Sequence, residues 1–540
     1  MEIEEKTLEP CVWTTHTVQT FQLVVQSDDV PPITLDHVDI NQQNIQYDGL
    51  PSVDERYSLY QDHATSTKHY LRAGIELFML LAIGTGLYWA DAETNSEDWD
   101  LNWDLESWQK KLVTGEGVSF DTNLFTTNTL NHTFGGSMYY LAARTNNLSI
   151  PMSLLFAIAG SAIWEYVGEF SEKVSINDMI VTPFGGMAVG ETFAQLGAFF
   201  DRGAKTPLNT VLSTLFAPHR RVHHWLDKTT PRRTGNVDRF GFTRDMFHQF
   251  SLWTASGLAT AWNTADPDKT RDTTGVVEIG LEAQLVNIPG YNQPREIVRF
   301  LSQGNFSTLR LTPTLGNDGL IDFFIFTRVA LAGYFTQQIT IDHEGQPEGS
   351  SVFLGVATAF DYSIERRLGR NDDHVGIIKL PGPTLDFWYM AHGFRLNAAI
   401  DLHANFALVD AYALDKHLAN GGSIAGAKSV LVKRGYYYAW GFTVAPRLRV
   451  VYRNLKMGGE LRYDRFDSIE GKDRFPEEVT NDFNLKDERT VYEVWVAHTF
   501  PSNRFRLGFN FEYRSRRGEL LDVVDRTEEY RYMGNLHILF

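Results

Sequence analysis

The sequence predicts an α+β membrane protein, in which an N-terminal helical domain precedes an antiparallel transmembrane β-barrel of about 12 strands. Three observations support this prediction. The last eleven residues, 530–540, alternate strictly between two faces and end on an aromatic residue. Several upstream runs of about ten residues share the same period of two, and that length crosses a bilayer at a tilt. Before Thr234-Gly235 the periodic segments follow a helical repeat instead.

The C-terminal segment is typical of the closing strand of a barrel. Six residues share one strand face, namely Tyr530, Tyr532, Gly534, Leu536, Ile538 and Phe540, and the other face begins with Arg531. The last residues of a soluble protein usually fray in water, whereas outer-membrane barrels carry aromatic residues at the membrane interface. A terminal Phe resembles the signal that the barrel-assembly machinery reads. We therefore expect a bacterial outer-membrane location and that machinery as a partner during biogenesis.

Composition narrows the possible functions. The 540 residues are 43% hydrophobic and 13% aromatic, with a mean hydropathy of -0.25, which fits a barrel with a polar lumen and aromatic girdles. A net charge of -18 argues against a general nucleic-acid binder. Cys11 is the single cysteine, so an intrachain disulfide and a CxxC motif are excluded. No cofactor is expected. The acidic start, Met1 to Glu5, does not resemble a signal peptide, so we expect that a leader has been removed.

Three regions are expected along the chain. Residues 1–65 are a polar arm, 66–234 a helical domain in the periplasm or plugging the barrel, and 235–540 the barrel. Helices are predicted near 68–90, 132–146, 151–170, 176–200 and 206–216. The apolar run 73–90 sits at the lower length limit of a membrane span, and it includes Glu76. A buried helix of the helical domain is the favoured interpretation.

The predicted strands have a charged second face. Alternating runs cover 277–285, 321–329, 394–402, 436–444 and 505–513, and their second faces carry residues such as Glu278, Arg395 and Arg506. A sandwich core does not tolerate such groups unpaired, but a polar lumen does. A soluble antiparallel sandwich or enzyme barrel is the alternative.

The helical domain carries the candidate chemistry. Glu165 and Glu169 lie four residues apart and share one helix face, so they need a cation, an arginine or a shared proton. Together with His132 and Glu191 they suggest a divalent-metal or acid–base site. The alternative pairs these carboxylates with arginines, for example Arg144 or Arg202, inside a closed bundle. The sequence contains no HExxH or GxSxG motif.

Asp178 belongs to the same candidate set but has a structural alternative. Ser175 and Asp178 fit a capping box, which would explain both residues without catalysis. Gly186 and Gly190 are spaced for close helix packing.

One basic cluster precedes the predicted barrel, and it consists of Arg220, Arg221, Arg232 and Arg233. Lipid headgroup phosphates are a plausible partner, and a solvated linker turn is the alternative. The adjacent His223 and His224 would point apart on a helix, so a shared metal is not expected.

Residues 121–225 resemble an uncharacterised outer-membrane family, the domain of unknown function 3943. The matching residues are Asp121, Asn128, Asn131, His132, Gly136, Ser137, Tyr140, Arg144, Gly160, Ser161, Trp164, Glu165, Glu169, Ser175, Ile176, Asn177, Asp178, Thr182, Gly185, Gly186, Gly190, Glu191, Pro218 and Arg221. Two positions depart from the family's pattern, because Thr133 replaces a Pro and Val222 replaces a Gly. The resemblance implies a helical domain before a barrel and implies no activity.

Three functions remain open on the sequence. The first is an outer-membrane barrel for envelope transport or organisation, with the helical domain capping or plugging it. The second is a membrane-embedded lipid-modifying hydrolase that uses the carboxylate–His cluster, and the third is a soluble β-rich binding protein. Outer-membrane lipids and a small-molecule or lipid ligand are the expected partners, and an enzyme is the less favoured interpretation.

Overall fold

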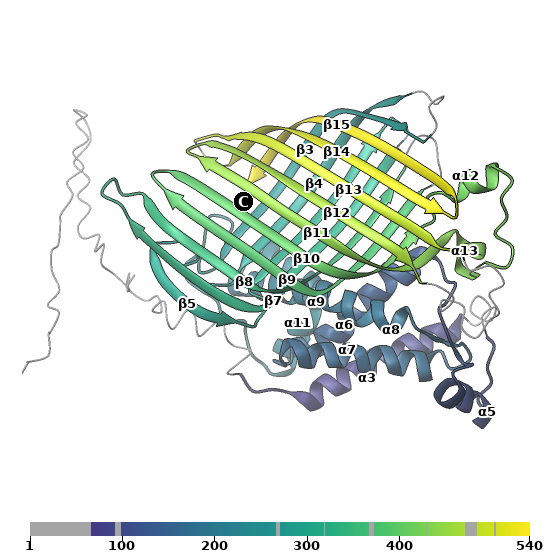
Figure 1. Ribbon diagram of the computed structural model, residues 1–540. Helices are drawn as coiled ribbons and strands as arrows, with labels where there is room; N and C mark the ends of the chain where they lie inside the picture. The colour runs from purple at the N-terminus through teal and green to yellow at the C-terminus, as the bar shows by residue number, and fades with distance from the viewer. Residues whose placement is uncertain are drawn as a thin grey trace, which may run out of the picture.

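The strands form one closed antiparallel barrel in the computed structural model (Figure 1). The structure describes residues 66–91, 99–265, 271–317, 319–366, 372–427, 429–469, 483–501 and 504–539. Twelve strands run in the order β7-β6-β4-β3-β15-β14-β13-β12-β11-β10-β9-β8, and a pairing between β7 and β8 closes the ring. Closure gives each of these twelve strands a paired neighbour on both sides, which a barrel needs in lipid. The predicted strand number is confirmed.

The strand boundaries extend the predicted runs. The barrel strands are β3 (Phe247–Asn263), β4 (Asp272–Val286), β6 (Phe306–Gly316), β7 (Gly319–Ile341), β8 (Pro347–Glu365), β9 (Asp373–Ala391), β10 (Phe394–Asp410), β11 (Tyr436–Tyr452), β12 (Leu455–Ser468), β13 (Leu485–Thr499), β14 (Phe505–Leu520) and β15 (Val523–Leu539). The long connections, from β10 to β11 and from β12 to β13, join strands at one end of the barrel. The turns at the opposite end are short, such as 392–393 and 453–454.

Strand alternation separates an apolar exterior from a charged lumen. Outward residues such as Tyr532, Leu536 and Ile538 are exposed, while Arg531 and Met533 on the other face of β15 are buried. This is the pattern of a transmembrane barrel, apolar outside and polar inside. The predicted fold class is confirmed, and the soluble sandwich is excluded. Phe540 and the arm 1–65 lie outside the described residues.

One strand position of the barrel wall, beside β7, is divided between two successive strands, β5 and β6. β5 (Arg295–Leu301) pairs with the part of β7 around Phe335, and β6 continues along the same strand from Phe306. Residues 302–305 form the break between them. Gly304 lies there with a φ of +67°, and a Cβ at this position would collide with Glu191 of the helical region. Glycine is therefore required where the backbone turns toward the helices.

The N-terminal region is a layered helical unit that spans residues 70–226. Its elements are α3 (Tyr70–Ala90), α5 (Leu105–Gln109), η2 (Lys110–Thr114), β1 (Val118–Ser119), η3 (Thr127–Asn131), α6 (His132–Arg144), α7 (Ile150–Ile163), η4 (Trp164–Gly168), β2 (Val174–Ser175), α8 (Asp178–Ile180), η5 (Val181–Gly185), α9 (Gly186–Arg202), α10 (Pro207–Phe216) and α11 (Pro218–Leu226). The η elements are π-helical turns. α6 packs between α9 on one side and α3 and α7 on the other. The predicted helix 176–200 is broken, and α5 and α11 were not predicted.

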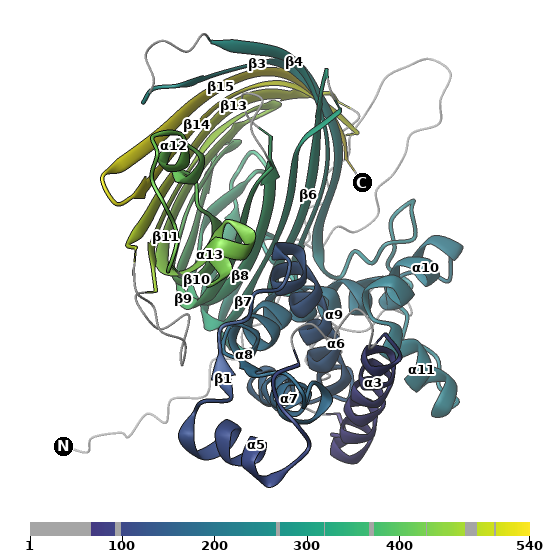
Figure 2. The same cartoon turned by 90° about the vertical axis from the view of Figure 1, so that its right-hand side faces the viewer.

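The helical unit lies against the outside of the barrel wall, not inside the lumen (Figure 2). Outward residues of the wall, including Phe360 of β8, Phe406 of β10 and Tyr438 of β11, are fully buried in a cluster with Val181 and Ala188 of the helical unit. The cavity in the lumen is lined by barrel residues, from Phe247 to His537. The expectation of a helical plug is therefore wrong for the described residues, because these outward wall side chains are apolar and provide a packing surface.

The first helix is also more exposed than predicted. Leu71, Phe78 and Leu87 of α3 have exposed fractions of 79%, 70% and 69%, so the expectation of a buried helix is wrong. By length and composition, two helices among the described residues are suited to cross a membrane, namely Tyr70–Ala90 and Ile150–Gly168. Both lie in the outer layer of the unit, away from the barrel wall (Figure 2).

The barrel's own insertion covers the long-connection end. Helices α12 (Leu414–Ala419) and α13 (Ser429–Arg434) lie at that mouth (Figures 1 and 2). Apolar residues of the insertion pack with inward residues of β9, β10 and β11. Lys416 Nζ donates hydrogen bonds to the backbone oxygens of Ala265, in the connection after β3, and of Val524, at the start of β15, at 3.1 and 2.9 Å. Residues 411–435 therefore form a cap that is anchored at more than one point of the rim.

Candidate functional site

A polar cluster lies where the helical unit meets the barrel wall. Ligand-type atoms of Asp121, His132 and Asp178 lie within 4.8 Å of one another. His132 Nε2 is 3.4 Å from Asp178 Oδ2, and the Asp178 side chain is 2% exposed. Two of the predicted candidates, His132 and Asp178, thus converge. Asp121 completes the cluster, although only the family resemblance pointed to it.

Neighbouring polar groups fix the orientation of each member. Asp121 Oδ1 accepts a hydrogen bond from the hydroxyl of Tyr438 on β11 at 3.1 Å and another from the Asn128 amide. Asp178 Oδ1 accepts from Asn177 Nδ2 at 2.9 Å. The Asn128 amide also donates to Tyr438 OH at 2.8 Å. The cluster is therefore tied to the barrel wall as well as to the helices.

Local backbone geometry brings the three segments together. π-helical turns lie immediately before His132 (η3) and shortly after Asp178 (η5), and π-turns are often found at functional sites. β1 and β2 pair in parallel, with Val118 opposite Val174, which places the segment leading to Asp121 beside the segment leading to Asp178. Gly136 and Gly186 allow backbone contact between α6 and the η5–α9 junction, since a Cβ at either position would collide with backbone atoms.

Burial controls the protonation of the cluster. Desolvation, followed by repulsion from Asp121 and Glu165, raises the pKa of Asp178 well above its usual value. Desolvation also lowers the pKa of His132. The fold therefore favours a neutral imidazole and resists a second full negative charge beside Asp121.

Glu165 adjoins the cluster and Glu169 does not join it. Glu165 Oε2 accepts a hydrogen bond from the Ser175 backbone amide at 2.8 Å. Ser175 Oγ in turn accepts from the Asp178 amide at 3.3 Å, so only the serine half of the predicted capping box forms. Glu165 lies within the π-turn η4 and Glu169 follows that turn directly, so the assumed α-helical spacing between them does not hold. Lys111 Nζ donates to the backbone oxygens of both residues at 3.1 and 3.4 Å.

Glu191 belongs to a separate buried ion pair. Arg144 Nε and Nη2 donate to its two carboxylate oxygens at 2.7 and 3.1 Å, and Tyr140 OH donates at 2.6 Å. Gln195 Nε2 donates to Glu191 Oε1 at 2.7 Å and to the Gln303 carbonyl at 2.6 Å. The closed-bundle alternative is correct for Glu191, which locks the helical unit to the break between β5 and β6.

The predicted basic cluster is divided by the fold. Arg220 and Arg221 both form ion pairs with Asp201, at 3.1 and 3.0 Å, so this carboxylate offsets one of their two positive charges. Arg232 and Arg233 lie exposed in the connection to β3. His223 Nε2 contacts Glu76 and His224 Nδ1 contacts Thr229, so the two histidines point apart as predicted.

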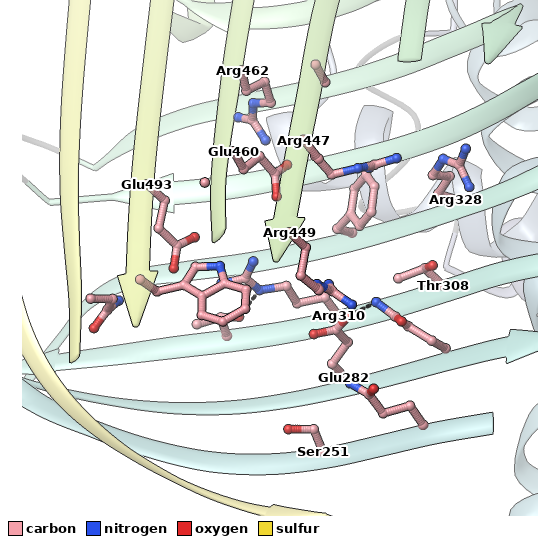
Figure 3. A pocket seen from close by; sticks show the side chains of 18 of the residues that line it. Ser251, Glu282, Thr308, Arg310, Arg328, Arg447, Arg449, Glu460, Arg462 and Glu493 are labelled. Carbon is pink, nitrogen blue, oxygen red and sulfur yellow. Dashed lines mark hydrogen bonds between the residues drawn. The ribbon is translucent and has the colours of Figure 1, made fainter. Parts of the chain in front are cut away.

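The lumen holds the second candidate site, a cavity of about 630 Å³, a volume typical of small-molecule sites. Charged side chains from many strands point into it, including Arg310, Arg449, Glu282 and Glu493 (Figure 3). Its lining contains 11 Lys or Arg and nine Asp or Glu residues. The cavity is therefore net cationic, although the whole chain carries -18.

Ion pairs across the lumen close the cavity toward the cap. Arg514 of β14 contacts Asp322 of β7 and Glu365 of β8 at 2.9 and 3.4 Å, five and six strands away around the ring. Arg489 of β13 contacts Glu365 at 3.3 Å. These residues line the cavity, whereas the apolar residues under the cap do not. The cavity thus ends at this ion-pair layer.

Four cations near the short-turn end have no such partners. Arg395, Arg449, Lys456 and Arg506 line the cavity, and none forms an ion pair with another described residue. Lys456 lies within electrostatic range of the other three. The guanidinium carbon of Arg449 lies 6.0 Å from the ring centroid of Trp495. Like charges gathered without direct ion-pair partners favour an anionic ligand. The predicted alternating runs included Arg395 and Arg506, whereas Arg449 and Lys456 lay outside those runs.

Fold and sites together define a transmembrane β-barrel with a helical unit on its outer wall. Residues 117–219 match the family model described as "Domain of unknown function (DUF3943)", in agreement with the resemblance drawn from the motifs. A comparison with curated proteins found no match.

Solved outer-membrane barrels are among the structural matches. OprB of Pseudomonas putida at high pH is 8% identical, with 54% of this chain and 94% of that chain covered and a TM-score of 0.20. OmpT of Vibrio cholerae is 8% identical over 55% and 97%, with a TM-score of 0.18. The translocator domain of the autotransporter NalP from Neisseria meningitidis is 8% identical over 62% and 98%, with a TM-score of 0.20.

Proposed function

We propose that the protein is an outer-membrane barrel that binds a small anionic solute in its lumen as part of envelope transport. The observation that carries this proposal is the group of unpaired cations, Arg395, Arg449, Lys456 and Arg506, in a cavity of small-molecule size among the described residues. Hydrogen bonds to charged groups contribute about 1.5–3 kcal/mol each. Three such contacts give at most about 9 kcal/mol, and an association cost of about 4 kcal/mol leaves submillimolar binding.

The two barrel ends suggest a direction of access. In outer-membrane barrels the longer loops face the outside and the short turns face the periplasm. By this rule, the cap and the cross-lumen ion pairs lie toward the exterior, and the cations lie toward the periplasm. A solute would enter from the periplasmic side, and its passage would require Arg514 to release Asp322 and Glu365 and residues 411–435 to move.

The helical unit has a separate role in this proposal. It occupies the place of lipid beside β7–β11, and the exposed apolar residues of α3 would contact lipid themselves. Arg232 and Arg233, in the connection to β3, remain candidates for lipid phosphates. The unit would thus organise the membrane around one side of the barrel, with the assembly machinery as a partner during insertion.

Anion binding by the folded protein tests the proposal. Isothermal titration in detergent would compare glucose 6-phosphate and inorganic phosphate with neutral glucose. We expect the anions alone to bind, and Lys456→Gln or Arg506→Gln to weaken binding by about 10-fold or more. The exposed Lys205→Gln is the matched control and should bind like the wild type. Equal affinity for glucose and for both anions, or unchanged binding in Lys456→Gln and Arg506→Gln, would refute it.

A further inference from the structure

We propose that Asp121, His132 and Asp178 form a binding site for a divalent transition-metal ion at the junction of the helical unit and the barrel wall. Their ligand-type atoms lie within 4.8 Å of one another. One imidazole and two carboxylates suit ions of the Zn²⁺ and Mn²⁺ type, with water completing the coordination. This inference is independent of anion binding in the lumen.

The distances fit shared ligation better than a direct hydrogen bond. The 3.4 Å between His132 Nε2 and Asp178 Oδ2 exceeds the usual N–H···O range. Two ligands each about 2.1 Å from a tetrahedral ion are about 3.4 Å apart. Both atoms therefore lie at the separation that a bound ion would impose.

The surrounding groups resemble the outer shell of a metal site. Tyr438 OH holds Asp121 Oδ1, and Asn177 Nδ2 holds Asp178 Oδ1, which leaves Asp178 Oδ2 directed at the imidazole. His132 Nδ1 faces Thr182 Oγ1 at 3.5 Å. Ligands in metal sites are commonly oriented by such second hydrogen bonds.

Charge balance provides an independent argument. Asp121, Asp178 and Glu165 lie within electrostatic range of one another. Glu165 is 1% exposed, and its Oε1 has no hydrogen-bond partner among the described groups. No described Lys or Arg forms an ion pair with any of the three, and Lys111 donates to the backbone oxygen of Glu165 instead of its carboxylate. A bound dication would offset the repulsion among these carboxyl groups and allow them to ionise together.

The site would also couple the two parts of the fold. Its ligands come from the segment after β1, from α6 and from α8. Asp121 is in addition hydrogen-bonded to Tyr438 of the barrel. Bound metal would therefore fix the helical unit against β11, and its removal would loosen that contact while the barrel stayed closed by its own strand pairs.

Metal titration of the full chain tests the proposal. After chelator treatment and dialysis in detergent, Zn²⁺ would be titrated against a chromophoric competitor. We expect one equivalent to bind, His132→Gln and Asp178→Asn to weaken binding by more than about 100-fold, and Tyr438→Phe to weaken it by about 10-fold, as loss of an outer hydrogen bond does. His343→Gln, in an exposed turn, is the control for adventitious binding by histidine.

Cobalt spectroscopy of the wild type keeps the proposal testable should the variants fail to fold. Co²⁺ bound by one imidazole and two carboxylates gives visible d–d bands, and added Zn²⁺ should remove them. Absence of a stoichiometric site in the wild type would overturn the proposal. Undiminished Zn²⁺ affinity in folded His132→Gln and Asp178→Asn would overturn it equally.

Discussion

Replacing Glu191 by Ala should release the helical unit from the barrel wall. The substitution leaves Arg144 buried, with 0% of its side chain exposed, and removes the acceptor for Arg144, Tyr140 and Gln195. Breaking a buried ion pair from one side costs about 3–5 kcal/mol, because the remaining charge is uncompensated. For a unit of this size, each kcal/mol lowers Tm by about 2–4 °C. The Tm of the helical unit should therefore fall by about 6–20 °C.

The assay separates the helices from the barrel. Circular dichroism at a helical wavelength follows the unit during heating, while migration on gels before and after boiling reports barrel closure. The barrel should remain heat-modifiable in Glu191→Ala, because its twelve strands pair with one another. Glu106→Gln removes an exposed helix pair with Lys110 and should change stability by less than about 1 kcal/mol. Equal helical Tm values for Glu191→Ala and the wild type would refute the role assigned to this pair.

Two further predictions concern the helical unit. Burial lowers the pKa of both His219 and His224. The folded state therefore binds fewer protons than the unfolded state in mildly acidic solution. The contribution of these two residues to stability is full above about pH 6.5 and should fall as the pH drops below that value. His219→Gln should flatten this slope in melts from neutral to mildly acidic pH, and an unchanged slope would contradict the assignment to this residue. The exposure of α3 can be tested with a polarity-sensitive dye attached to Phe78→Cys or Leu87→Cys in a chain whose Cys11 is replaced by Ser. The dye should report an apolar environment in vesicles at these two positions and water at the control position, Lys205→Cys. A water-like signal at all three positions would exclude contact between α3 and lipid.

The barrel could be predicted because the face of the strand on which a residue lies is determined by its position in a short stretch of sequence. A period of two with a charged second face, as in Phe394 to Leu402, sets which side of each strand meets lipid. Strand number followed from counting such runs. The break between β5 and β6 at residues 302–305 could not be predicted, because it depends on the contact between Gly304 and Glu191, which lie far apart in sequence.

The position of the helices was not predictable for a related reason. An outward-facing Phe360 or Tyr438 has the same pattern whether lipid or another part of the chain covers it. A plug was therefore a reasonable expectation from size alone. The exposure of α3 follows from the same arrangement, since α6, not α3, is enclosed by the other helices.

The candidate sites were predictable in part. His132 and Asp178 were singled out as polar residues in an apolar region, and they converge. Glu191, chosen on the same grounds, pairs with Arg144 instead. Sequence alone could not separate the two cases, because both involve carboxylates on neighbouring helices. The lumen cations come from β10, β11, β12 and β14, and the register of these strands, which lie close together in the sheet, brings them together.

Ion conductance across planar bilayers tests the central claim most directly, namely that the lumen is an anion-binding chamber closed at its capped end. Wild-type protein should show no steady conductance. A variant with residues 412–434 replaced by a short Gly-Ser turn and with Arg514→Gln should conduct and prefer anions, and adding Lys456→Gln and Arg506→Gln should weaken that preference. Steady conductance by the wild type, or cation preference in the opened variant, would contradict the account.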